Sequence, residues 1–207
     1  MKKQITLIAI LLVMACKQET KTETAVSTSN EPKQEIVTQH TSSANYSSLF
    51  DAYNCDITIV ELAKVLDIPA SDIILGKNNS AEHCVFILKS FGEGYENTGT
   101  KLRFGPSFST KNNNKKVITK SLEEKREMPN GKMHAGRDIL LTDSGDCYIM
   151  FQPAHGRTLI LNENYKRLFM ISYGSKASVK GRTKEQQDKL AQKTKDLANY
   201  LVSKHKK

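Results

Sequence analysis

The sequence of 207 residues contains no tryptophan, and only 7% of its residues are aromatic. Its one apolar run, residues 5–13, is shorter than the roughly 20 residues that a permanent membrane-spanning helix needs. With 38% hydrophobic and 26% charged residues, the composition excludes a collagen, a coiled coil and a fully disordered chain. The length excludes a large multidomain enzyme and allows one domain of ordinary size, or two very small ones.

The motifs of several common active sites are also missing. No G-x-S-x-G pattern occurs, which argues against the nucleophile elbow of the α/β-hydrolases. The phosphate-binding pattern G-x-x-x-x-G-K-[ST] and the zinc pattern H-E-x-x-H are absent, as are C-x-x-C and the D-x-D-x-D-G calcium loop. Gly92 and Gly94 begin a dinucleotide-binding pattern, but Asn97 stands where its third glycine belongs. We therefore expect no cofactor.

The N-terminus has the layout of a secretory signal. Two lysines precede the apolar residues 5–13, and Val13-Met14-Ala15-Cys16 follows. This ending resembles the lipobox of bacterial lipoproteins, although Met14 is less usual there than Ala, Ser or Thr. The resemblance implies that residues 1–15 are removed and that Cys16 carries the acyl chains (palmitate among them) of a stable membrane anchor. The alternative is an ordinary signal peptide whose cysteine is accidental.

A polar segment follows the lipobox. Residues 17–48 are dominated by Thr, Ser, Gln, Glu and Lys, with Tyr46 as their one aromatic. Such a composition buries too little apolar area to offset the entropy of ordering, so we expect residues 16–48 to form a lipidated cysteine and a flexible tether. Residue 17 is not Asp, which favours the outer membrane of the cell envelope, on its periplasmic or surface side.

The excess of positive charge is concentrated at the C-terminus. Residues 176–207 hold 10 basic and 3 acidic residues, whereas residues 50–175 hold 16 and 15. The basic segment has one aromatic, Tyr200, and therefore lacks the interleaved aromatics typical of nucleic-acid binders. We expect no nucleic-acid partner. The segment forms either a solvated helix face or a surface attracted to anionic envelope components.

Periodicity in the rest of the chain predicts an α+β fold. Residues 57–66 read as a helix with a capping box formed by Thr58 and Glu61, and residues 184–204 read as an amphipathic helix. A polar helix is predicted between them. The apolar runs predicted as strands are residues 83–90, 101–104, 139–141, 147–151, 158–161 and 168–173. We expect an antiparallel sheet with packed helices, in a single domain spanning residues 49–207.

The order of these features resembles small bacterial lipoproteins with a PsbP/Mog1-like exported domain. A cysteine precedes the first helix, another lies in the next strand, and Gly145-Asp146-Cys147-Tyr148 opens the later strands. Two departures are that Cys147 stands where a small residue such as Ala is usual, and that the usual tryptophan is absent. The resemblance implies no fixed activity.

Three thiols remain once Cys16 carries lipid. Export to an oxidising compartment predicts one disulfide among Cys55, Cys84 and Cys147, and the residues alone leave all three pairings open. The resemblance implies Cys55–Cys84. Cys147 would then be an inert core cysteine, or a catalytic thiolate if a histidine lay beside it.

One polar cluster is a candidate site. His134, Asp146 and His155 could bind a ligand or a metal ion, although aspartate beside Gly145 is also common in turns. Four further basic residues could frame an anionic ligand: Arg137, Arg157, Lys166 and Arg167.

Two functional hypotheses remain. The first is a membrane-anchored bacterial lipoprotein that binds a partner protein or an envelope component without catalysis. The alternative is an envelope hydrolase or metal-dependent enzyme that uses His134 or His155 with Asp146. Convergence of these three side chains in one pocket would favour the enzyme.

Overall fold

The computed structural model describes residues 44–77, 82–93, 99–109 and 111–207. The predicted lipobox with Cys16, and most of the predicted polar segment, lie outside the described residues. The described part of the chain contains no helix that is long and apolar enough to cross a membrane.

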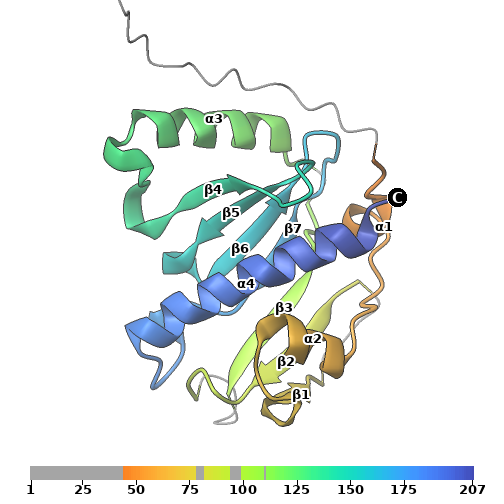
Figure 1. Cartoon of the computed structure of the whole chain (residues 1–207), viewed down its shortest axis with the longest axis vertical. Coiled ribbons are helices and arrows are strands. Elements are labelled where there is room, and N and C mark those ends of the chain that lie inside the picture. Colours follow the sequence, from red (N-terminus) through yellow and green to blue (C-terminus); the bar gives the residue numbers. More distant parts are fainter. Residues whose placement is uncertain (1–43, 78–81, 94–98, 110) are drawn as a thin grey trace, which may run out of the picture. The chain divides into compact units, whose positions relative to one another are not determined.

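Seven strands in the described residues form one antiparallel sheet in the order β1-β2-β3-β7-β6-β5-β4 (Figure 1). The strands are β1 (Ile73–Leu75), β2 (Cys84–Leu88), β3 (Thr100–Pro106), β4 (Asp138–Leu141), β5 (Tyr148–Gln152), β6 (Arg157–Leu161) and β7 (Phe169–Ser172). The third strand thus pairs with the last one, and the chain from β4 to β7 forms the other half of the sheet as a meander. The predicted α+β class with an antiparallel sheet is confirmed.

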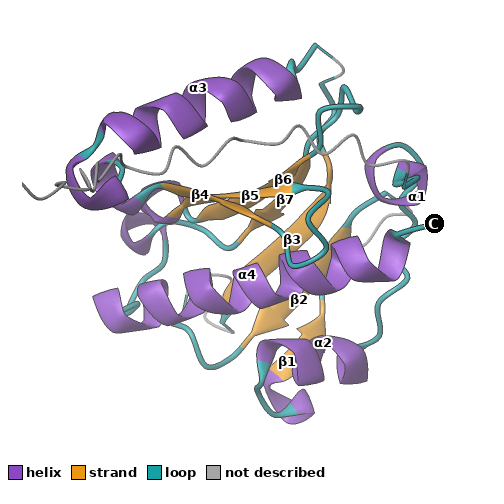
Figure 2. Ribbon diagram, turned by 45° about the horizontal axis from the view of Figure 1, so that its top comes forward, coloured by secondary structure: helices purple, strands orange, loops and turns teal. Residues whose placement is uncertain are grey.

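Helices cover both faces of the sheet. They are α1 (Ser47–Phe50), α2 (Ile59–Leu66), α3 (Asn114–Glu127) and α4 (Lys184–His205). Figure 2 shows α3 on one side of the sheet and α2 and α4 on the other. Five short 3-10 turns complete the description: η1 (Ala70–Asp72), η2 (Pro129–Gly131), η3 (His134–Gly136), η4 (Pro153–His155) and η5 (Lys176–Ser178).

Local sequence signals set the starts of the helices α2 and α4. At α2 the Thr58 hydroxyl accepts from the Glu61 amide at 3.2 Å, and the Glu61 carboxylate accepts from the Thr58 amide at 2.7 Å. Thr183 and Gln186 repeat this capping box at α4. The two helices begin and end within two residues of the ranges that the sequence predicted.

Alternation along the strands divides the apolar side chains into two clusters. In β6, Ile160 faces the large cluster under α1, α2 and α4, whereas its neighbours Leu159 and Leu161 face a smaller cluster under α3. The large cluster contains Cys84, Phe104 and Leu201 and many other residues that are fully buried. Both faces are therefore apolar in the half of the sheet that α3 covers.

The folded domain begins earlier than the sequence predicted. Tyr46, which we assigned to the tether, is fully buried, and α1 begins at the next residue. The backbone of Asn45 bonds to that of Lys207 in both directions, at 2.8 and 3.1 Å. The start of the described chain and the C-terminus therefore lie side by side at one end of α4 (Figure 1). The short edge strand β1 was also missed by the prediction.

Candidate functional site

His134 and His155, two of the predicted site residues, lie on neighbouring turns. His134 opens η3 and His155 closes η4, and both residues are exposed. The turns pack closely, because a Cβ added at Gly136 of η3 would lie 3.2 Å from Pro153 Cγ of η4. The structure thus brings these two elements together although the strands β4 and β5 separate them in the chain.

Asp146, the third predicted residue, lies at the other end of β5. One of its carboxylate oxygens accepts from the Tyr46 hydroxyl at 2.7 Å and pairs with Lys206 Nζ at 2.5 Å. Asp146 precedes the five-residue strand β5 and His155 follows it, so about 17 Å of strand separates them. Among the described residues no three His, Cys, Asp or Glu side chains are placed to hold a metal ion. The predicted constellation of His134, Asp146 and His155 is therefore not assembled.

A hollow of about 720 Å³ lies where η3, η4 and η5 meet the first turns of α4. Small residues form much of its wall, and Gln187 and the ion pair of Lys184 with Asp188 supply polar groups. The residues that line it are Ala135, Gly136, Pro153, Ala154, Ser175, Lys176, Ala177, Lys184, Gln187 and Asp188. Apolar walls with few polar groups are typical of ligand and partner pockets. The sequence gave no sign of this hollow, because three turns that are distant in the chain build it.

A buried arginine supports the floor of this region. Arg182 is 4% exposed, and its guanidinium donates to the Gly174 carbonyl and to Gln187 Oε1, both at 2.7 Å. It also donates to the Phe91 carbonyl and the Thr100 hydroxyl. Because burial disfavours its charge, the pKa of Arg182 is lowered to about 10. Arg182 therefore ties β3, the loop after β7 and the start of α4 together.

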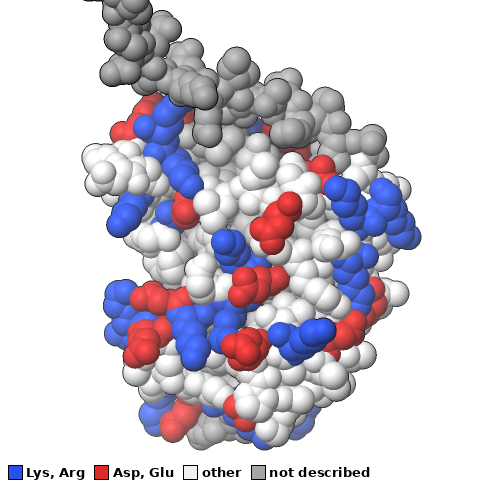
Figure 3. All heavy atoms as spheres, in the orientation of Figure 1, with Lys and Arg blue, Asp and Glu red and all other residues white. Residues whose placement is uncertain are grey.

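Several lysines of the C-terminal basic segment form ion pairs, most of them with carboxylates outside the segment. Four of its lysines pair with carboxylates at 2.5–3.8 Å: Lys184 with Asp188, Lys193 with Asp67, Lys204 with Asp56 and Glu61, and Lys206 with Asp146. Lys193 is also buried and donates to the Leu66 and Asp67 carbonyls. Figure 3 shows basic and acidic side chains interleaved over the face that α4 crosses. The helix therefore presents no continuous basic stripe on this face.

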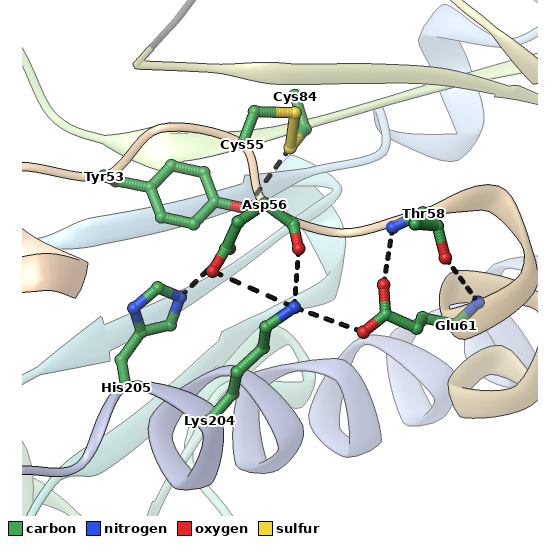
Figure 4. Close-up of a disulfide and its surroundings, with 8 residues drawn as sticks. All are labelled: Tyr53, Cys55, Asp56, Thr58, Glu61, Cys84, Lys204 and His205. Carbon is green, nitrogen blue, oxygen red and sulfur yellow. Dashed lines mark hydrogen bonds and ion pairs between the residues drawn. A yellow bond between two sulfur atoms is a disulfide. The ribbon is translucent and has the colours of Figure 1, made fainter.

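The disulfide joins Cys55 to Cys84, the pairing that the family resemblance implied. It lies between the loop before α2 and strand β2, beside the end of α4 (Figure 4). The Tyr53 hydroxyl lies 3.2 Å from Cys84 Sγ, and the Tyr53 and Phe169 rings form a T-shaped pair with 5.0 Å between centroids. The other two pairings are excluded, because Cys147 is free and buried.

The remaining thiol lacks the setting of a nucleophile. Cys147 is fully buried, and this burial raises its pKa to about 12. Its sulfur lies 3.5 Å from the Asn162 amide nitrogen, and its own amide donates to Thr142. A thiol with so high a pKa stays protonated at neutral pH, so it behaves as an apolar core residue.

One group of residues that the sequence analysis missed has the types of a catalytic triad. His205 Nδ1 lies 3.1 Å from Ser48 Oγ, and His205 Nε2 lies 3.3 Å from Asp56 Oδ1. The imidazole is only 5% exposed and packs on the Tyr53 ring, with 5.6 Å between centroids. The imidazole is therefore closed off from solvent, and Ser48 is half-buried. Ser48, Asp56 and His205 instead fasten the end of α4 to the start of the domain.

The four basic residues proposed from the sequence as an anion frame are dispersed. Arg137 pairs with Glu124, and Arg167 pairs with Glu82, each at 3.3 Å. Lys166 lines a separate hollow beside the loop before α3. Within the described residues neither Lys166 nor Arg157 forms an ion pair, and Arg157 Nε donates to Gln152 Oε1.

Comparison with known proteins gives no assignment. No protein-family model matches the chain, and no curated protein sequence and no solved structure matches it either.

Proposed function

We propose that this chain is a lipid-anchored protein of the bacterial cell envelope whose folded domain is a non-catalytic binding or interaction module. The observation that carries the proposal is the sequence Val13-Met14-Ala15-Cys16 after a charged and then apolar leader. The polar segment that follows is suited to carry a domain away from the membrane surface. We further propose a PsbP/Mog1-like relationship for the domain, which its antiparallel sheet and long final helix support.

The cysteine chemistry of the domain supports export. Cys55 and Cys84 are joined, which is typical of proteins that fold outside the reducing cytoplasm. Cys147, the unpaired thiol of the described domain, is buried away from oxidants and partners. This leaves Cys16 as the cysteine available for acylation.

The position of the hollow fits a binding role. The described chain begins beside Lys207, at the C-terminal end of α4, and the hollow lies at the N-terminal end of that helix. A helix of 22 residues is about 33 Å long. A protein anchored through its N-terminus would therefore carry the hollow about one helix length from the point where the tether enters the domain.

The hydrolase alternative has less support. It required Asp146 beside His134 or His155, and Asp146 is instead held by Tyr46 and Lys206 at the far end of β5. The two histidines lie on neighbouring exposed turns, where they are free to contact a partner.

Mass spectrometry of the full chain, extracted from bacterial membranes in mild detergent, tests the proposal. We expect a mass that lacks residues 1–15, carries added acyl chains and has two hydrogens fewer for the disulfide. The variant C16S should remain unprocessed and unacylated, whereas the matched variant C147S should be acylated normally. An intact N-terminus, or cleavage that leaves a bare cysteine, would refute the lipid anchor.

A further inference from the structure

A row of polar side chains crosses the middle of the sheet on the face opposite α4. Arg103 of β3 pairs with Ser172 of β7, and Ser172 pairs with Arg157 of β6. Residues directly opposite each other in an antiparallel sheet project from the same face. The next row, Phe104, Ile171 and Thr158, faces the core under α4, so Arg103, Ser172 and Arg157 project from the other face. Figure 1 shows these three strands side by side.

Glycines hold this row in place. The Tyr173 amide donates to the Gly156 carbonyl at 2.8 Å, immediately beside the Arg157–Ser172 pair. A Cβ at Gly156 would lie 1.9 Å from the Gly174 carbonyl carbon, so only glycine permits this close approach. The two strand ends, and with them Arg157 and Ser172, are therefore fixed by backbone contact.

No carboxylate of the described chain neutralises the two arginines. Arg157 donates to the neutral amide oxygen of Gln152, and Arg103 takes part in no ion pair within the described residues. Glu82, the acidic residue beside His83, is held by Arg167 at 3.3 Å. Arg103 is exposed and Arg157 is half-buried. The strands that carry them are two strand spacings apart, about 10 Å.

An exposed aromatic ring adjoins the row. Phe108 is 75% exposed, and the Arg103 guanidinium lies 5.8 Å from the centroid of its ring. The Phe108 ring also packs on His83, with 4.8 Å between centroids. His83 in turn covers Gly105, where a Cβ would lie 2.7 Å from the imidazole. Burial and the charge of Arg103 lower the pKa of His83, which agrees with a positive potential over this face.

We infer that Arg103, Ser172, Arg157 and Phe108 form a docking surface for an acidic segment of a partner protein. The inference rests on the proposed function, since it names the partner of the binding module. Each guanidinium would hold one carboxylate, the Ser172 hydroxyl would donate between them, and Phe108 would contact an apolar side chain. In an extended peptide, side chains on one side recur about every 7 Å. The long arginine side chains bridge the difference between this repeat of about 7 Å and the distance of about 10 Å that separates the strands of Arg103 and Arg157.

The composition and place of the surface favour a protein partner over lipid head groups. Arginine and aromatic residues are enriched in protein–protein interfaces. The row lies at the Arg157 end of β6, whereas the described chain begins near Tyr165, beyond the other end of that strand. A strand of five residues, about 17 Å, thus separates this row from the side where a membrane tether enters, whereas Phe108 follows the end of β3 that pairs with Phe169.

Binding of a synthetic peptide to the full chain in non-ionic detergent tests this inference. The probe is a ten-residue peptide of alternating Glu and Ser, labelled at its N-terminus, and a Gln-Ser peptide is the control. Fluorescence anisotropy should show salt-sensitive binding of the Glu-Ser peptide alone. The variants R103Q and R157Q should each weaken it at least fivefold. The control R126Q removes an equal charge from an exposed position on α3 and should change affinity less than twofold.

A second peptide, with Leu at a central Ser position, tests the apolar contact. It should bind at least threefold more tightly, and F108S should abolish that gain. A cooperative unfolding transition in urea establishes that each variant is folded. Arg103 and Phe108 are exposed, so R103Q and F108S keep the test decisive if R157Q is unstable.

Three results would overturn the inference. The first is no binding of the Glu-Ser peptide at 1 mM, and the second is an equal loss in R126Q, which would indicate unspecific attraction. The third is that the parent protein binds phosphatidylglycerol vesicles but not the peptide, and that R103Q abolishes the vesicle binding. That result would make the surface a membrane contact. The mass of the same sample reports acylation of Cys16, so failure of the anchor and failure of the docking surface are distinguished.

Discussion

Replacement of Gly156 by alanine tests how strongly the packing of β6 against β7 depends on one missing side chain. Gly156 has a φ of +60°, and an added Cβ would lie 1.9 Å from both the carbonyl carbon and the oxygen of Gly174. A left-handed conformation costs an L-residue about 1–2 kcal/mol. Overpacking against a backbone that cannot rotate away costs about 1–3 kcal/mol more. We therefore expect G156A to lower the free energy of unfolding by about 2–5 kcal/mol in total.

Gly145 provides the matched control. Its φ is +76°, and an added Cβ would meet nothing within 4 Å. The variant G145A should therefore lose only the conformational part, about 1–2 kcal/mol.

The assay for this pair is equilibrium urea unfolding of the oxidised full chain, followed by far-ultraviolet circular dichroism. Equal slopes against urea for all variants would allow the midpoints to be compared directly. Equal losses in G156A and G145A would refute the reasoning, because they would mean that the contact of Gly156 with Gly174 contributes nothing. A G156A chain as stable as the parent would refute the conformational argument as well.

Two further predictions concern the disulfide and the buried histidine. Removing the disulfide in C55A/C84A opens a loop of 29 residues and should lower the free energy of unfolding in urea by about 3–4 kcal/mol. Because Cys147 is not part of the disulfide, a reductant should destabilise C147A as much as it destabilises the parent. Burial lowers the pKa of His205 below its ordinary value of 6.5, so the unfolded chain takes up a proton more readily. The unfolding free energy should be level above about pH 6.5 and fall on acidification, and H205Q should flatten this fall. A fall of the same steepness in H205Q would contradict the assignment, and His83 supplies the slope that remains.

Local signals predicted most elements of the fold. The capping box at Thr58 and the apolar period of α4 depend only on neighbouring residues, and both helices form where expected. Two elements escaped prediction for the same reason, which is that they are short. The four residues of α1 and the three of β1 are stabilised by contact with α4 and β2 and not by their own periodicity.

The early start of the domain shows how tertiary contact overrides composition. Residues 17–48 are polar enough to predict a tether, yet Tyr46 is buried and donates its hydroxyl proton to Asp146. The partner is 100 residues away in the chain, and no window of local composition contains it. A single aromatic residue in a polar segment was the one available sign.

The candidate sites were less predictable, because they depend on the order of strands in the sheet. Arg157 was one of four basic residues singled out from the sequence, and the other three were Arg137, Lys166 and Arg167. Arg137 and Arg167 pair with acidic residues, and Lys166 lies in a different hollow.

Arg103 enters the docking surface only because β3 leaves its sequence neighbour β4 and pairs with β7. Had β3 continued into a simple meander, Arg103 would not face Ser172, and Arg157 would stand alone between Gln152 and a neutral strand. The outward alternation of Lys101 and Arg103 marked a strand with one polar face, but only the pairing gives that face its second arginine. The charge of the surface is thus a property of the sheet topology, and for this reason we test it at Arg103, the residue that the topology adds.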